Sequence, residues 1–444
     1  MDEKGYLLAS IQQKDHNGEF KPRNIVSFGT CWLLYTIATS SLSMLGPFFP
    51  AESLLRIFPP LQAAARGASS GIVGAIFSIS PLCVTVLSPV LGYHLHQFGL
   101  KFALVAGTLL MGASFLLFGF VTQAPAGVVF ISLCFFLQFG QGLGCAMLTT
   151  AAYALVGTLF NRRFGMFMGF MEFAGGLGCT LGPLVGGSLY HLYKFELPFY
   201  VIGGALLFFT VPMFLIIEPA GPHSKHQYSP KIGRKLLTNP MYLTLILCDV
   251  IAMAGLFVFV PILSPYLLQE FVLDPFKIGV VSSVDSIFYM LLGLFAVPLF
   301  ERCRIPPRPF IIISLVIAGA GYVLMGPAKF LTTPQLWITV LGLAGAGFGC
   351  ALTILLTYLE MMSVAREELI HLNENEIDAV PGLIAGTVAC ALSCGELVGP
   401  LLGGVLREKL DFTETTTTFG GVLVAQAILL FLVSTIHTCY KRTT

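Results

Sequence analysis

The feature that most constrains this chain is a series of long apolar runs, because each run is long enough to cross a lipid bilayer. A membrane-spanning helix needs about 20 consecutive, mostly apolar residues. Glycine is frequent within the runs, which favours close helix packing in lipid. The sequence therefore predicts an all-α integral membrane protein with twelve transmembrane helices. The twelve runs are residues 25–50, 71–93, 102–121, 128–150, 164–190, 197–217, 241–265, 278–299, 309–327, 336–359, 382–405 and 419–438.

Composition argues against a water-soluble protein. Charged residues make up 11% of the 444 residues, whereas soluble domains carry about 25%. The net charge of +1 gives no basic surface for nucleic acid. The 11 cysteines do not indicate a metal site, because the closest pair, Cys390 and Cys394, has no companion pair at zinc-ligand spacing. We therefore expect a protein that is not an enzyme and that holds neither metal nor cofactor.

The apolar runs divide into two groups of six, separated by the longest polar connection between runs. This organisation predicts an N-terminal tail (1–24), a first bundle (25–217), a central loop (218–240), a second bundle (241–438) and a C-terminal tail (439–444). Placing both termini in the cytoplasm puts 17 of the 24 Lys and Arg residues on the cytoplasmic side. This placement satisfies the positive-inside rule, so we expect both termini to be cytoplasmic.

The two groups of runs repeat each other in the same order. Repeats of this kind predict two similar six-helix bundles related by an axis along the membrane normal, with a substrate site between them near the midplane. The matching segments are GASFLLFG (112–119) with GAGYVLMG (319–326), GLGCAMLT (142–149) with GFGCALT (347–353), and GCTLGPLVGG (178–187) with GELVGPLLGG (395–404).

Carboxylates are the ionisable groups that could act within the membrane, since the predicted spans contain no Lys or Arg. An ionisable side chain at mid-membrane costs about 2.5–3.5 kcal/mol and usually marks a transport path. The all-acidic set favours a cation or a proton as the ligand over an anion. Each acid could instead link helices through hydrogen bonds. The candidates for substrate or proton binding are Glu172, Asp249, Asp285, Glu396 and Glu360.

For two of these acids, the sequence leaves open a role other than substrate or proton binding. Glu396 lies inside a Gly-Pro packing segment, which favours a structural role. Glu360 lies at the cytoplasmic end of the tenth run, where it could be a solvated helix-end charge.

Spans five and eleven share a Gly-Pro motif with glycines at every fourth position. Such glycines leave a flat stripe on one helix face for a neighbouring helix, and the proline removes a backbone hydrogen bond and bends the helix. The motif could be a passive packing surface or a gate between bundles. Its residues are Gly178, Gly182, Pro183, Gly186, Gly187, Gly395, Gly399, Pro400, Gly403 and Gly404.

The motif of span five resembles the antiporter signature of the proton-coupled exporters of the major facilitator superfamily. The loop after span two resembles that family's cytoplasmic loop motif in Gly92, Gly99 and Lys101. It departs from the family pattern at His96, where Asp is usual. Span four departs at Gln138, where Arg is usual. The resemblance implies the major facilitator fold over essentially the whole chain.

Segments 41–54, 172–190 and 399–412 resemble the vesicular amine transporter family, solute carrier family 18, and most of all its polyamine branch. The monoamine and acetylcholine members place an Asp inside span one. Here the first acid of that region is Glu52, at the luminal end of the span. The resemblance therefore implies a polyamine in preference to a monoamine.

The N-terminal tail contains an acidic dileucine pattern formed by Glu3, Leu7 and Leu8. Vesicle-coat adaptors read such patterns on the cytoplasmic side, so an adaptor is an expected partner. The expected location is an intracellular vesicle membrane, with the plasma membrane as the alternative.

Together these features predict a secondary transporter that exchanges luminal protons for cytosolic polyamines or related organic cations. The proton gradient would supply the energy without a cofactor. The partners would be a small cation, protons and the lipid bilayer, with no nucleic acid. Two alternatives remain: a broad organic-cation or drug/proton antiporter, and a non-transporting scaffold on a transporter fold.

Overall fold

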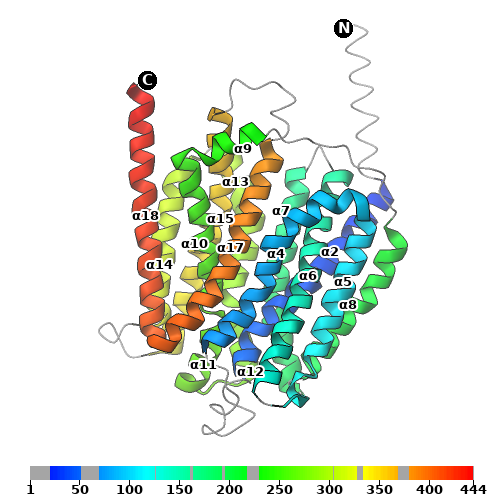
Figure 1. The fold of residues 1–444 in the computed structure, drawn as a ribbon. Helices are drawn as coiled ribbons and strands as arrows, with labels where there is room; N and C mark the ends of the chain where they lie inside the picture. Colours follow the sequence, from blue (N-terminus) through cyan, green and yellow to red (C-terminus); the bar gives the residue numbers. More distant parts are fainter. Residues whose placement is uncertain are drawn as a thin grey trace.

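The computed structural model describes residues 21–51, 70–125, 127–160, 164–192, 196–217, 230–303, 305–327, 334–368 and 380–443. Across these residues the regular secondary structure is helical, without a strand (Figure 1). The first half contains α2 (Pro22–Ala51), α4 (Ser70–Phe98), α5 (Leu100–Phe118), the 3₁₀ turn η3 (Val121–Gln123), α6 (Val128–Leu159), α7 (Phe164–Leu192) and α8 (Glu196–Ile216). The second half contains α9 (Pro230–Leu237), α10 (Pro240–Val258), α11 (Val260–Phe271), α12 (Pro275–Ser282), α13 (Val284–Cys303), α14 (Pro307–Met325), α15 (Leu336–Glu368), α17 (Val380–Lys409) and α18 (Phe412–Thr443).

Each of the twelve predicted runs coincides with one helix or with two consecutive helices, so the predicted fold class is confirmed. Eleven helical stretches among the described residues are long and apolar enough to cross a membrane. The twelfth predicted span, α7, is 29 residues long but is not among these eleven.

Two predicted spans are each broken into a pair of helices. The seventh is divided at Phe259, between α10 and α11, where Pro261 lies in the first turn of the second helix and cannot donate a backbone hydrogen bond. The eighth is divided at Ser283, between α12 and α13. The side chain of Ser283 donates to the carbonyl oxygens of Gly279 (2.8 Å) and Thr180 (3.1 Å). The apolar runs predicted the spans but not these interruptions.

The central loop and the span ends contain more helix than the apolar runs indicate. The short helix α9 lies within the predicted loop, and α15 continues to Glu368, beyond its apolar run. Asn239 begins α10 by accepting from the backbone N–H groups of Met241 (2.9 Å) and Tyr242 (3.2 Å). Asparagine is a strong helix N-cap, so the start of this span has a local cause.

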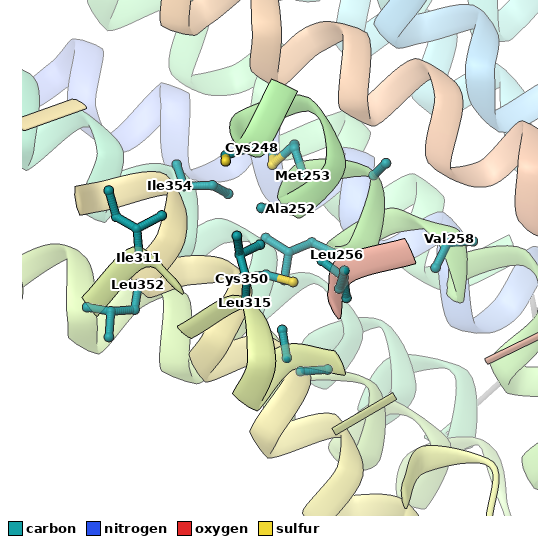
Figure 2. Packing of buried hydrophobic residues seen from close by; sticks show 14 of the residues in the cluster. Cys248, Ala252, Met253, Leu256, Val258, Ile311, Leu315, Cys350, Leu352 and Ile354 are labelled. Carbon is teal, nitrogen blue, oxygen red and sulfur yellow. The ribbon is translucent and has the colours of Figure 1, made fainter. Parts of the chain in front are cut away.

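Each half has a hydrophobic core of its own. The core of the second half includes Cys248, Leu256, Leu315 and Cys350, which interdigitate between α10, α14 and α15 (Figure 2). Buried residues of the first half form two clusters, one around Leu104 and one between α4, α5, α6 and α8. The buried clusters therefore gather separately in the two halves of the chain.

The helix contacts of one half reproduce those of the other. In the first half α2 packs against α7, α5 against α6 and α4 against α6. In the second half α10 packs against α17, α14 against α15 and α13 against α15. These pairs correspond under the predicted repeat, so the sequence repeat is also a repeat of packing.

We call the two ends of the bundle the proximal end and the distal end, according to the helices that lie there. α9 and the last turn of α18 lie at the proximal end, and α11 and α12 lie at the distal end (Figure 1). The halves meet along two main seams, one between α4 and α17 and the other between α7 and the pair α12 and α13, and α11 also contacts α2. α4 and α12 begin at the distal end, and α7 and α17 finish there.

Candidate functional site

The side chain of Glu172 lies on α7 and is held by hydroxyl groups from both halves. The Tyr153 hydroxyl, from α6, donates to Oε1 of Glu172 (3.1 Å). The Tyr289 hydroxyl, from α13, donates to Oε2 (3.3 Å). Each oxygen of one carboxylate is therefore bound by a different half of the protein. Glu172 is partly exposed although it lies well inside its helix.

Aromatic residues of α2 complete this arrangement. The hydroxyl of Tyr35 is hydrogen-bonded to that of Tyr153 (3.2 Å), and Tyr35 is almost fully buried. One turn earlier, the Trp32 indole N–H donates to the carbonyl oxygen of Phe170 (2.8 Å), and its ring stacks on Phe173. These contacts fix α2 against the part of α7 that presents Glu172.

Three of the predicted acids lie within electrostatic range of one part of α7. The thiol of Cys179, two turns after Glu172, lies within electrostatic range of Glu172, Asp285 and Glu396. The carboxylates of Glu172 and Glu396 also act on each other directly. The acids come from α7, α13 and α17, so both halves contribute. We call Glu172, Asp285, Glu396 and the tyrosines Tyr35, Tyr153 and Tyr289 the central site.

The acids of the central site are not arranged to bind a metal ion. Among the described residues, no group of three or more His, Cys, Asp or Glu side chains is close enough to hold one. Separate carboxylates suit a ligand whose positive charges are themselves separated. Aromatic faces beside them add favourable contacts for an organic cation.

Asp249 lies elsewhere, inside the second half between α10 and α15. It is fully buried, and Thr357 of α15 donates a short hydrogen bond to its Oδ1. Its Oδ2 is buried without a hydrogen-bond partner among the described residues. Asp249 is thus packed apart from the contacts that join Glu172 to the second half.

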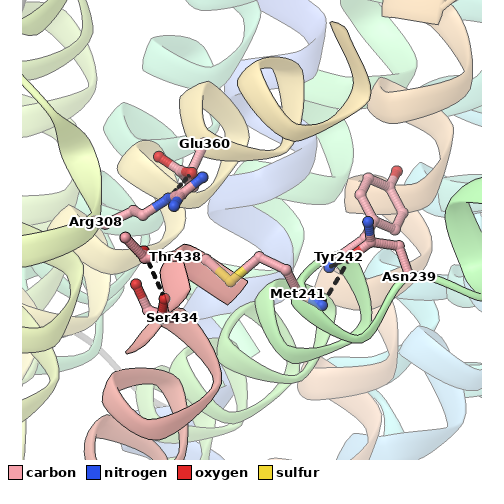
Figure 3. Close-up of polar contacts among 7 residues, drawn as sticks. All are labelled: Asn239, Met241, Tyr242, Arg308, Glu360, Ser434 and Thr438. Atoms are coloured by element: carbon pink, nitrogen blue, oxygen red, sulfur yellow. Dashed lines mark hydrogen bonds and ion pairs between the residues drawn. The ribbon is translucent and has the colours of Figure 1, made fainter. Parts of the chain in front are cut away.

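Glu360 forms an ion pair with Arg308 near the proximal end (Figure 3). Glu360, on α15, is nearly fully buried, and Arg308 begins α14. The carboxylate is therefore neither a solvated helix-end charge nor a neighbour of Glu172 in the contacts described.

The glycines at every fourth position of the Gly-Pro motif pack each half internally, at Gly178 and Gly182 in α7 and at Gly395, Gly399 and Gly403 in α17. A Cβ atom at Gly182 would lie 3.1 Å from the backbone nitrogen of Met44 in α2, and Ser43 donates to the carbonyl oxygen of Gly178 (3.3 Å). A Cβ atom at Gly399 would lie 2.6 Å from the carbonyl oxygen of Ala254 in α10. The stripe therefore lets α7 approach α2, and its repeat lets α17 approach α10.

The prolines of the same motif face the other half. The carbonyl oxygen of Pro183 lies against Gly279 of α12, and that of Pro400 lies against Gly74 of α4. One turn further along α4, Ser78 donates to the carbonyl oxygen of Leu397 (2.8 Å).

The hydrogen bond from Ser78 to Leu397 in the α4–α17 seam corresponds to the one from Ser283 to Thr180 in the α7–α12 seam. Thr180 and Leu397 both lie three residues before the motif's proline. The two seams are therefore built alike. The motif forms both a packing surface within each half and a contact between halves.

The loop motif after span two lies at the proximal end of α4 and α5. Gly99 has a φ of 82°, a backbone conformation that favours glycine, and it is the N-cap of α5. Lys101 lies over the ring of Phe214 in α8 at 4.4 Å. Gly92 and His96 belong to the last turns of α4. Glu3, Leu7 and Leu8 of the dileucine pattern and Glu52 lie outside the described residues.

Sequence reasoning found the acids of the central site but missed its tyrosines. Tyrosine is common in membrane helices, and nothing in the sequence links Tyr35, Tyr153 and Tyr289, which are far apart along the chain. A usable signal was the glycine pair Gly175 and Gly176 after Glu172. A Cβ atom at Gly176 would lie 3.2 Å from the Tyr289 ring.

Comparison with known proteins agrees with this architecture. The sequence family described as Major Facilitator Superfamily matches residues 31–359 and 245–438. The chain belongs to this superfamily. Members of this superfamily are transporters and not enzymes, and they generally need no cofactor, so the chain is a multi-pass membrane transporter.

Curated relatives refine the comparison. The human MFS-type transporter SLC18B1 (Homo sapiens) is 33% identical over 384 residues, covering 83% of this chain and 77% of that protein. This similarity confirms the resemblance to solute carrier family 18. Multidrug resistance protein MdtG of Salmonella heidelberg (strain SL476) is 24% identical over 402 residues, covering 89% of this chain and 92% of that protein.

A solved structure shows the same fold. It is the crystal structure of a bacterial homologue of the human lysosomal transporter Spinster, in an inward-facing and unoccupied conformation. The TM-score is 0.67 at 12% identity, and the match covers 95% of this chain and 98% of that one.

Proposed function

We propose that this transporter is a proton-coupled antiporter that loads polyamines or related organic cations into acidic vesicles. The observation that supports this most directly is the carboxylate of Glu172, which hydroxyl groups from both halves hold and which lies within electrostatic range of Glu396. A polyamine has several ammonium groups along a flexible chain. Because charge-assisted hydrogen bonds are the strong ones, several separate carboxylates suit such a ligand better than a single acid would.

Coupling to protons follows from competition for the same carboxylates. A carboxyl group that holds a proton cannot also pair with an ammonium group, so the two ligands exclude each other. An acidic lumen would load the central site with protons and release the cation. Asp249, fully buried and with one oxygen unpaired, is a second candidate for a proton site.

The arrangement of the halves supports alternating access. The described seam contacts at Gly74, Ser78 and Gly279 lie toward the distal end. With the proximal end in the cytoplasm, this arrangement is one closed to the lumen. The similarity in fold to an inward-facing transporter supports the same assignment. The location in vesicles and the adaptor at the dileucine pattern belong to this proposal too.

A broader organic-cation or drug antiporter is the second candidate. It is favoured by the similarity to a multidrug resistance protein and by the aromatic side chains around Glu172. Such a protein would accept planar monovalent cations as readily as polyamines.

Uptake into proteoliposomes tests both candidates. Spermidine and a monovalent aromatic cation would be offered to the wild type, Glu172→Gln, Glu396→Gln and the exposed control Glu414→Gln. The proposal predicts spermidine uptake that falls strongly in the first two variants and is unchanged in the control. Preference for the aromatic cation would favour the drug antiporter. Absence of any uptake would favour the scaffold alternative.

A further inference from the structure

The carboxylate of Glu172 is shared between the two halves in a way that assigns different roles to its two hydroxyl partners. Tyr153 lies in the same half as Glu172, so its hydrogen bond (3.1 Å) stays intact when the halves move. Tyr289 lies in the other half, so its hydrogen bond (3.3 Å) must change whenever α13 moves relative to α7. One carboxylate therefore has one fixed donor and one movable donor.

The contact with Tyr289 is built into the backbone packing and is not a chance side-chain encounter. Gly176, one turn after Glu172, lets α13 approach α7 closely. A Cβ atom at position 176 would lie 3.0 Å from Cα of Met290 and 3.2 Å from Cδ1 of Tyr289. Such a separation is tighter than nine in ten real Cβ contacts, so an alanine at position 176 would require α13 to give way by a few tenths of an ångström.

The three tyrosine hydroxyls and the carboxylate of Glu172 form a chain of hydrogen bonds. Tyr35 bonds to Tyr153, and Tyr153 donates to Glu172. With Tyr153 on one oxygen and Tyr289 on the other, the carboxylate is satisfied in the absence of a ligand. The hydroxyls thus occupy the positions that the N–H groups of an ammonium ion would take.

We propose that Tyr289 is the positioning residue that links occupancy of Glu172 to the relative position of the two halves. The proposal rests on the proposed function in taking the ligand to be an organic ammonium ion. While its hydroxyl binds Glu172, Tyr289 helps to hold α13 against α7. An arriving ammonium group takes over Oε2, and the displaced hydroxyl no longer joins the halves. Binding therefore weakens the contact that keeps the distal end closed.

The test compares two variants that each remove one donor from the same carboxylate. Tyr289→Phe removes the bond between halves, and Tyr153→Phe removes the bond within one half. Both keep the aromatic ring and its packing. A hydrogen bond to a charged group changes an equilibrium by about tenfold at the weak end of its range, which suits the 3.3 Å separation.

The readout is the distance between spin labels on opposite halves at the distal end, measured by pulsed electron paramagnetic resonance in lipid nanodiscs. Val128 and Trp337 are exposed, in the first turns of α6 and α15, and serve as label sites. The exposed cysteines of the described residues would be replaced by serine; they are Cys303, Cys390 and Cys439.

Without substrate, Tyr289→Phe is expected to raise the distal-open population relative to the closed one by about tenfold. Tyr153→Phe is expected to leave it unchanged. Gly176→Ala, which separates α13 from α7 while keeping every hydroxyl, should act like Tyr289→Phe. Equal populations in wild type and Tyr289→Phe, or equal shifts in both tyrosine variants, would overturn the proposal.

Adding spermidine gives the second readout. It should open the distal end of the wild type but shift Tyr289→Phe less, because the bond that it displaces is already absent. The substrate-free comparison does not depend on which cation is transported. Failure of spermidine uptake alone would therefore count against the proposed function, whereas an unshifted Tyr289→Phe would count against the role of Tyr289.

Discussion

The sharpest prediction concerns the two glycines at the distal seams. A methyl group at position 74 would overlap the carbonyl oxygen of Pro400, and one at position 279 would overlap that of Pro183. Both obstacles are backbone atoms, so no side-chain rotation can relieve them. Gly74→Ala and Gly279→Ala should therefore force α4 away from α17 and α12 away from α7.

The expected size follows from the cost of overpacking. Inserting an extra carbon into a well-packed contact costs about 1–3 kcal/mol. When the two halves separate at the distal end, the overlap is relieved, so the substitution destabilises only the closed arrangement. The ratio of distal-open to distal-closed protein should then rise by about 5- to 150-fold.

The same distance measurement between Val128 and Trp337 reads this ratio. Gly204→Ala and Gly421→Ala are matched controls, because a Cβ atom at either position would have no neighbour within 4 Å. The seam variants should lengthen the distal distance, and the controls should not. Distances that are the same in the seam variants and the controls would refute the assignment of these glycines to a closing contact.

Three further predictions address other parts of the molecule. Gly182→Leu places a branched side chain against α2 and should abolish uptake while the protein still inserts, as measured by uptake per inserted molecule; normal uptake would refute the packing argument. Glu360→Gln leaves Arg308 unpaired and should lower stability by about 3 kcal/mol; an unchanged Tm in detergent would show that the pair does not stabilise the fold. Asp249→Asn removes an ionisable group from a fully buried position and should slow proton-driven uptake at normal expression; an unaltered rate would assign Asp249 a structural role.

The helices could be predicted because lipid imposes a simple rule on them. Every backbone polar group in the membrane must be satisfied internally, so a run of apolar residues of sufficient length becomes a helix. The interruptions at Phe259 and Ser283 depend on individual contacts of the backbone and side chains, which a count of apolar residues does not include. Pro261 was a visible signal for the first interruption. Ser283 gave no such signal, because its partner is a carbonyl oxygen of Thr180 in the other half.

The candidate site could be predicted only in part. Mid-membrane acids stand out in a sequence because they are costly there, and Glu172, Asp285 and Glu396 all lie within electrostatic range of Cys179 on α7. It places Asp249 in a separate buried contact with Thr357, a distinction that depends on which face of α10 points toward α15. The face that α10 turns toward α15 depends on how several helices pack together, so the sequence of α10 alone does not determine it.

The central claim is that an acidic lumen drives cation uptake through the central site. The most direct measurement is spermidine uptake into proteoliposomes with an acidic interior, before and after the pH gradient is collapsed at constant membrane voltage. The account predicts uptake that depends on the gradient and that is lost in Glu172→Gln. Uptake that continues unchanged after the gradient is collapsed would contradict it.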